Sequence, residues 1–100
     1  MDIPLMPHLT LEYTDNLHVD VDFGGLFARI HKVLAEDGAI RIGNCKSRAV
    51  QLDSYRVGDG EPVAFVHADL RFLEGRSQDV KTRLGARILE ILNEAFGSRA

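Results

Sequence analysis

The chain has few features of a secreted, membrane or nucleic-acid-binding protein. Its 100 residues include one cysteine and no tryptophan. A single cysteine cannot form a disulfide within the chain, which is typical of proteins from reducing compartments. The sequence has neither a run of about 18 apolar residues for a membrane span nor the basic and apolar regions of a signal peptide. We therefore expect a cytoplasmic protein with no membrane partner.

The sequence also lacks an excess of positive charge. The formal net charge is −3, and no long run of like charges is present. Because nucleic acids attract basic surfaces, we expect no nucleic-acid partner. The hydrophobic content of 45% is that of a folded protein rather than a disordered chain. The length predicts a single domain over residues 1–100, small enough for oligomerisation to help stabilise it.

Motifs of common metal and hydrolase sites are missing too. The sequence contains no HExxH, GxSxG or GxGxxG segment. The lone cysteine, Cys45, is expected to be a small semi-buried thiol, although Lys46 beside it would lower its pKa. The four histidines show no closely paired ligand spacing: His8, His18, His31 and His67. We therefore expect no metal.

The stretch Met6–Tyr13 alternates as a half-buried strand does. Leu9, Leu11 and Tyr13 fall on one side of it. Pro7 stands at its start, where a proline costs no ladder hydrogen bond. If the mature chain began at Pro7, the strand would instead start with a secondary amine. The ordinary pKa of an α-amino group, roughly 7.7 to 8.0, suits a general base. The residues alone leave both roles open.

A helix and a second strand are predicted next. Apolar residues recur at spacings of three and four from Leu26 to Leu34, with Asp20 or Asp22 as the N-cap. Gly38 is expected at the left-handed position that ends this helix. Residues 39–47 are predicted as a loop, and Arg48–Val57 as a strand with Val50 and Leu52 on its buried side. Strand, helix and strand form a βαβ unit, so the two strands should be parallel.

The remaining residues predict a strand and a helix. Gly58-Asp59-Gly60 predicts a tight turn that joins the second strand to the third, Val63–Phe72, as a hairpin. Ser77 caps the last helix, and Gly97 ends it. The expected apolar stripe of this helix is Val80, Leu84, Ile88, Leu89, Ile91, Leu92 and Phe96. Both helices should cover one side of the sheet, and the bare side favours self-association.

Three cations are candidates for binding a substrate. Lys46 and Arg48 precede the second predicted strand, and Arg76 lies between the third strand and the last helix. Each of them alone is compatible with an ordinary solvated charge. A guanidinium group, however, binds a carboxylate through two parallel hydrogen bonds. Together, and close to a terminal amine, they would form a site for an acidic substrate.

Several segments resemble the tautomerase superfamily and, within it, the 5-carboxymethyl-2-hydroxymuconate isomerase family. They lie in order between Met6 and about Phe96: residues 6–17, 25–28, 46–48, 59–60, 64–67 and 75–77. The resemblance implies an α+β fold with a β-α-β core, one mixed sheet with two helices packed on one face, and a homotrimer. It implies that Pro7, as the N-terminal residue, is the catalytic base. It also implies that Lys46, Arg48 and Arg76 bind the substrate and that no cofactor is needed.

The sequence departs from the family pattern at three points. Residues 1–6 precede Pro7 as an N-terminal extension, Lys46 stands where the family usually has arginine, and the family continues beyond the second helix into a closing strand. The main hypothesis is an isomerase that ketonises an acidic 2-hydroxymuconate-type dienol in the catabolism of aromatic compounds. The alternatives are a non-catalytic oligomeric protein that binds a small molecule and a tautomerase of another substrate, such as an aryl pyruvate.

Overall fold

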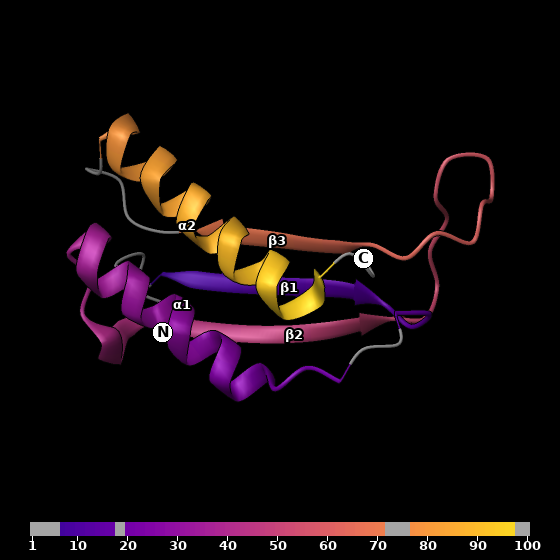
Figure 1. Cartoon of the computed structure of the whole chain (residues 1–100), viewed down its shortest axis with the longest axis horizontal. Coiled ribbons are helices and arrows are strands. Elements are labelled where there is room, and N and C mark those ends of the chain that lie inside the picture. Colours follow the sequence, from indigo (N-terminus) through magenta and orange to yellow (C-terminus); the bar gives the residue numbers. More distant parts are fainter. Residues whose placement is uncertain (1–6, 18–19, 72–76, 98–100) are drawn as a thin grey trace, which may run out of the picture.

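Three strands and two helices make up the part of the chain that the structure, a computed structural model, describes: residues 7–17, 20–71 and 77–97. Both helices lie on the same side of the sheet (Figure 1), which confirms the predicted arrangement. In chain order the elements are β1 (His8–Thr14), α1 (Phe23–Gly38), the 3-10 helix η1 (Ile42–Asn44), β2 (Lys46–Leu52), β3 (Val66–Arg71) and α2 (Gln78–Phe96).

The strand order is β2-β1-β3, so β1 lies in the middle of a mixed sheet. It pairs with β2 in parallel, as predicted for a βαβ unit, and with β3 in the antiparallel sense. The predicted hairpin between β2 and β3 is wrong, because β1 separates these strands. The predicted turn does reverse the chain within their connection, where Gly58 has φ 54° and Gly60 has φ 109°, but too far from the strands to pair them.

The strands differ from the prediction in their ends and in one face. β2 begins at Lys46 and ends at Leu52, so Lys46 and Arg48 lie within the strand rather than before it. The prediction that Val50 is buried is wrong, since its side chain is 42% exposed on the side away from the helices. The reason is the parallel register, which places Ser47 and Ala49 opposite the buried Leu9 and Leu11 of β1.

β3 is also shorter than predicted and begins at Val66. Val66, Ala68 and Leu70 pack against the core, whereas His67 alternates with them on the other face. The expected end of the strand at Phe72 lies outside the described residues.

The core fills the space between the sheet and the two helices. Leu9 and Leu11 of β1 contribute to it together with Ile30, Leu34 and Leu84 of the helices, all of them almost completely buried. Burying a leucine side chain contributes about 1.5 to 3 kcal/mol to stability. The amphipathic pattern of the helices therefore selects the side on which the sheet is covered.

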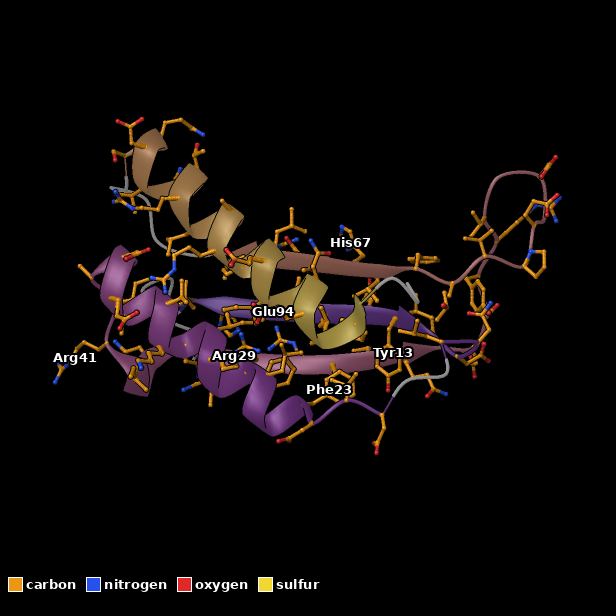
Figure 2. The ribbon with its side chains drawn as sticks, in the orientation of Figure 1. Tyr13, Phe23, Arg29, Arg41, His67 and Glu94 are labelled. Atoms are coloured by element: carbon orange, nitrogen blue, oxygen red, sulfur yellow. The ribbon has the colours of Figure 1, made fainter. Side chains whose placement is uncertain are left out.

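Salt bridges join the outer surfaces of the helices. Arg29 of α1 pairs with Glu94 of α2, and Figure 2 shows the two residues on neighbouring helices. Arg87 of α2 reaches back to Glu36 and Asp37 of α1, with nitrogen to oxygen distances of 3.4 and 3.0 Å. These pairs link the two helices at the surface.

The ends of α1 confirm one prediction and correct another. Asp22 is the N-cap, and its side chain accepts a backbone hydrogen bond of 3.1 Å from the first turn. Gly38 is the last helical residue rather than the left-handed one, which is Ala39 with φ 53°. A Cβ atom at position 38 would lie 3.2 Å from Ile40 Cδ1 and 3.3 Å from Leu84 Cδ1. Glycine is therefore needed there for close packing, not for a positive φ.

The ends of α2 are as predicted. Ser77 Oγ accepts a hydrogen bond of 3.2 Å from the backbone N–H of Val80, and Gly97 ends the helix with φ 62°. The predicted apolar stripe is correct except at Leu89, whose side chain is 58% exposed. None of the helices in the described ranges is long and apolar enough to cross a membrane.

Candidate active site

Pro7 lies directly before β1 and is fully buried. Its carbonyl oxygen accepts a hydrogen bond of 3.0 Å from the backbone N–H of Lys46, the first residue of β2. The next residue, His8, is the register partner of Lys46 in the parallel ladder. The structure therefore brings Pro7 and Lys46 together at one end of the sheet.

Arg48 lies on the open face of the sheet at the same end. Its guanidinium nitrogens Nη1 and Nη2 are 3.4 and 3.5 Å from Nδ1 of His8. A guanidinium group only donates hydrogen bonds, so His8 Nδ1 accepts when it carries no proton. The distances are at the long end for hydrogen bonds. The contact places the Arg48 side chain close to the residue that follows Pro7.

A third cation, Arg71, was missed by the sequence analysis. It is the register partner of His8 on the other side of β1, so Lys46 and Arg71 flank His8 from the two neighbouring strands. Arg71 Nε donates a hydrogen bond of 3.1 Å to Asp69 Oδ2, and the Arg71 side chain is 82% exposed. The predicted cation Arg76 lies outside the described residues.

The side chains of His8, Arg48 and Arg71 border a shallow hollow of about 340 Å³ on the open face of the sheet. At its far end Glu12 of β1 pairs with His67 of β3, at a distance of 3.6 Å between His67 Nδ1 and Glu12 Oε1; Figure 2 labels His67 on β3. The hollow is lined by His8, Thr10, Glu12, Arg48, His67, Asp69 and Arg71. Positive charge is thus concentrated at the Pro7 end, which suits an anionic ligand.

Two titratable side chains lie near Lys46 on the covered side of the sheet. Burial, and to a lesser extent the positive charge of Lys46, lower the pKa of His31 in α1. Burial raises the pKa of the Cys45 thiol, and the opposing effect of Lys46 is smaller. Cys45 is buried, and its thiol contacts the carbonyl oxygen of Arg41 at 3.7 Å. The prediction of Cys45 as a small thiol shielded from solvent agrees with this environment.

The described residues show no group of three or more His, Cys, Asp or Glu side chains placed to hold a metal ion. What they bring together is a buried proline, a lysine and two arginines around one end of β1. Cations in this arrangement can hold carboxylates and stabilise a negative oxygen.

Comparison with known proteins gives consistent matches. Residues 7–100 match the sequence model of the 5-carboxymethyl-2-hydroxymuconate isomerase family. The 5-carboxymethyl-2-hydroxymuconate Delta-isomerase of Escherichia coli is 31% identical over 94 residues, which cover 93% of this chain and 75% of that protein.

Solved structures agree with this match. The crystal structure of a 5-carboxymethyl-2-hydroxymuconate isomerase from Deinococcus radiodurans R1 has a TM-score of 0.83 and 38% identity, over 95% of this chain and 72% of that one. A second structure, titled 5-carboxymethyl-2-hydroxymuconate delta-isomerase, has a TM-score of 0.76 over 92% of this chain and 72% of that one. At 24% identity it supports the fold alone.

Proposed function

The chain belongs to the 5-carboxymethyl-2-hydroxymuconate isomerase family, and from this premise we propose that Pro7 is the base that moves the proton. Family membership makes the chain an isomerase and favours this activity over the alternative of a non-catalytic binding protein. The observation that carries the proposal is the convergence of Pro7, Lys46 and Arg48 at one end of the sheet. The family match also begins at Pro7.

The proposed base requires that Pro7 be the first residue of the mature protein. In the full sequence its nitrogen belongs to the Met6–Pro7 peptide bond and has no basic lone pair. Removal of residues 1–6 would convert it into a secondary amine. Burial and nearby positive charge both disfavour the protonated form of an amine. Pro7 is buried and its backbone is bonded to that of Lys46, so we expect burial and the cations of β2 to lower the pKa of this amine and favour its neutral form.

The substrate named by the family is an acidic dienol. A 5-carboxymethyl-2-hydroxymuconate carries carboxylates and an enol hydroxyl. Pro7 would take a proton from the hydroxyl or a carbon of the dienol and return one at another carbon, which gives the conjugated enone. Lys46, Arg48 and Arg76 would hold the carboxylates and stabilise the negative oxygen that develops. This chemistry requires neither a metal nor an organic cofactor.

The assembly proposed for the chain is a cytoplasmic homotrimer. The support is the open face of the sheet, which bears a polar hollow and is not covered by either helix. A second or third copy would cover this face and extend the sheet edges. Sedimentation of the purified protein would measure the mass of the assembly.

The decisive experiment compares two forms of the protein, one that begins at Pro7 and one that keeps residues 1–6. The intact mass of the protein purified from its native host shows which of the two forms is the mature one. We expect the form that begins at Pro7 to ketonise 5-carboxymethyl-2-hydroxymuconate and the extended form to be slower by about 10²-fold or more, because general bases contribute typically 10² to 10⁴-fold. Pro7→Ala should also lose most of the turnover while still binding substrate.

Equal rates for the two forms would show that Pro7 is not the base. Turnover by neither form would remove the proposed isomerase mechanism altogether.

A further inference from the structure

A hydrogen bond on the covered side of the sheet joins α1 to the strand that carries two of the cations. His31 Nε2 lies 2.6 Å from Ser47 Oγ. Ser47 stands between Lys46 and Arg48 in β2, but strand alternation points its side chain the opposite way from theirs. Its register partner is the buried Leu9. Ser47 is half-buried, and its hydroxyl is stabilised by a hydrogen-bond partner, which His31 provides.

The same end of β2 is bonded to Pro7 through the backbone. The N–H of Lys46, directly before Ser47, donates to the carbonyl oxygen of Pro7 at 3.0 Å. A continuous connection therefore runs from the imidazole of His31, through Ser47 and the Lys46 amide, to the residue proposed as the base. Among the strands of the described residues, β2 pairs with β1 alone. Its contact with α1 is thus an important constraint on where this end of the strand lies.

We propose that His31 is a positioning residue: through Ser47 it holds the first residues of β2 against α1 and so places Lys46 and Arg48 for the substrate carboxylates. This inference rests on the proposed function. His31 lies in the helix layer, whereas Arg48 lines the hollow on the other face. It therefore acts on the cations through the strand and not by contact with the substrate.

The electrostatics around His31 agree with this role. Burial and the Lys46 ammonium group lower the pKa of His31, so its imidazole is neutral near pH 7. A neutral imidazole can bond the Ser47 hydroxyl as donor or as acceptor, depending on its tautomer. It does so without adding a positive charge beneath Lys46.

The test is a double-mutant cycle in the form of the protein that begins at Pro7. His31→Phe and Ser47→Ala each remove one partner of the hydrogen bond. We expect each to raise the KM for 5-carboxymethyl-2-hydroxymuconate by about three- to tenfold, the worth of one net hydrogen bond, with kcat changed much less. Because both remove the same interaction, the double variant should resemble either single variant. His31→Gln should restore the KM, since the glutamine amide reaches the position of Nε2.

A matched control removes a hydrogen bond at the opposite end of the sheet. Tyr55 Oη donates to Asp15 Oδ1 at 2.9 Å, beyond the carboxyl end of β1. Tyr55→Phe should leave the KM unchanged. If His31→Phe and Ser47→Ala alter thermal stability but not KM, or if their effects on KM add in the double variant, the proposal is overturned.

A second measurement does not depend on activity. Hydrogen exchange of the Lys46 amide, which is bonded to Pro7, should be faster in His31→Phe than in the wild-type protein. The amide of Leu26, bonded to the Asp22 carbonyl at 2.9 Å, serves as the reference and should not change. Unchanged exchange at Lys46 overturns the positioning role, whereas absence of turnover in the wild-type form that begins at Pro7 overturns only the proposed function.

Discussion

The helix-covered face of the sheet presents leucine, valine and alanine side chains, whereas the open face presents histidines, arginines and carboxylates. Both faces are built from alternate residues of the same strands. In β1, Leu9 and Leu11 are buried under the helices, and Thr10 between them lines the hollow. The comparison shows that burial on one face leaves the other face available for polar groups, because neighbouring side chains of a strand point in opposite directions.

One polar pair breaks this division. His31 and Ser47 lie on the covered side, directly beneath the strand residues whose cations face the other way. Both side chains are half-buried, and a polar pair shielded from water in this way costs stability when its partners are unsatisfied. Its position under Lys46 and Arg48 suggests that the covered face contributes to the site by holding the open face in place.

The comparison can first be tested by removing side chains from two adjacent residues of β1. Leu11→Ala should reduce the free energy of unfolding by about 2 to 5 kcal/mol, because it leaves a cavity in the core. Thr10→Ala, on the open face, should change it by no more than about 0.5 kcal/mol. Urea denaturation monitored by circular dichroism measures both values. Similar losses for the two variants would contradict the division between the faces.

The second test compares arginines on the two sides of the molecule. In the form that begins at Pro7, Arg48→Ala should raise the KM by about 10- to 100-fold, because a hydrogen bond to a charged group is worth about 1.5 to 3 kcal/mol. Arg29→Ala removes the salt bridge to Glu94 on the outer helix surface and should leave the KM unchanged. A KM that responds equally to both would show that substrate does not bind at the open face.

A third test compares two glycines of the helix layer. Ala at position 85 would meet no atom within 4 Å, so Gly85→Ala should stabilise the protein by about 0.5 to 1 kcal/mol through helix propensity. At Gly38 the same gain is opposed by contacts of 3.2 and 3.3 Å with Ile40 and Leu84, and overpacking costs about 1 to 3 kcal/mol. Gly38→Ala should therefore lower the melting temperature. If Gly38→Ala raises the melting temperature as much as Gly85→Ala does, position 38 has room for a methyl group and the close contacts with Ile40 and Leu84 do not constrain it.

Local features of the fold could be predicted from the sequence because each depends on a few neighbouring residues. The alternation of β1 and the caps at Asp22 and Ser77 are of this kind. The strand order is not, because a period of two residues reveals which side of a strand is buried but not which strand lies beside it. The hairpin was predicted on the basis of a turn, and pairing with the central β1 prevailed over it.

The candidate site could be predicted only in part, for the same reason. Pro7, Lys46 and Arg48 were candidates from their residue types, the family resemblance assigned their roles, and the parallel register brings them together. Arg71 was missed, since only the antiparallel register of β3 against β1 brings it beside His8. The contact of His31 with Ser47 joins a helix to a strand and has no signature in the spacing of the two residues.

The smallest expected effect is the dependence of stability on pH through His31. Its pKa in the folded protein lies below the ordinary value of 6.5 because of burial and then of Lys46. Below pH 6.5 the unfolded chain therefore binds a proton at this position more readily than the folded protein does. The contribution of neutral His31 to the free energy of unfolding is consequently fully present above pH 6.5, and it falls as the pH drops toward the lowered pKa.

His31→Gln removes this titration. Urea denaturation of the variant at pH 7.5 and pH 5.5 should show a smaller difference in the free energy of unfolding than the wild-type protein shows. An identical difference would mean that His31 has the same pKa in both states, and that the face beneath the cations is as accessible to water as the open one.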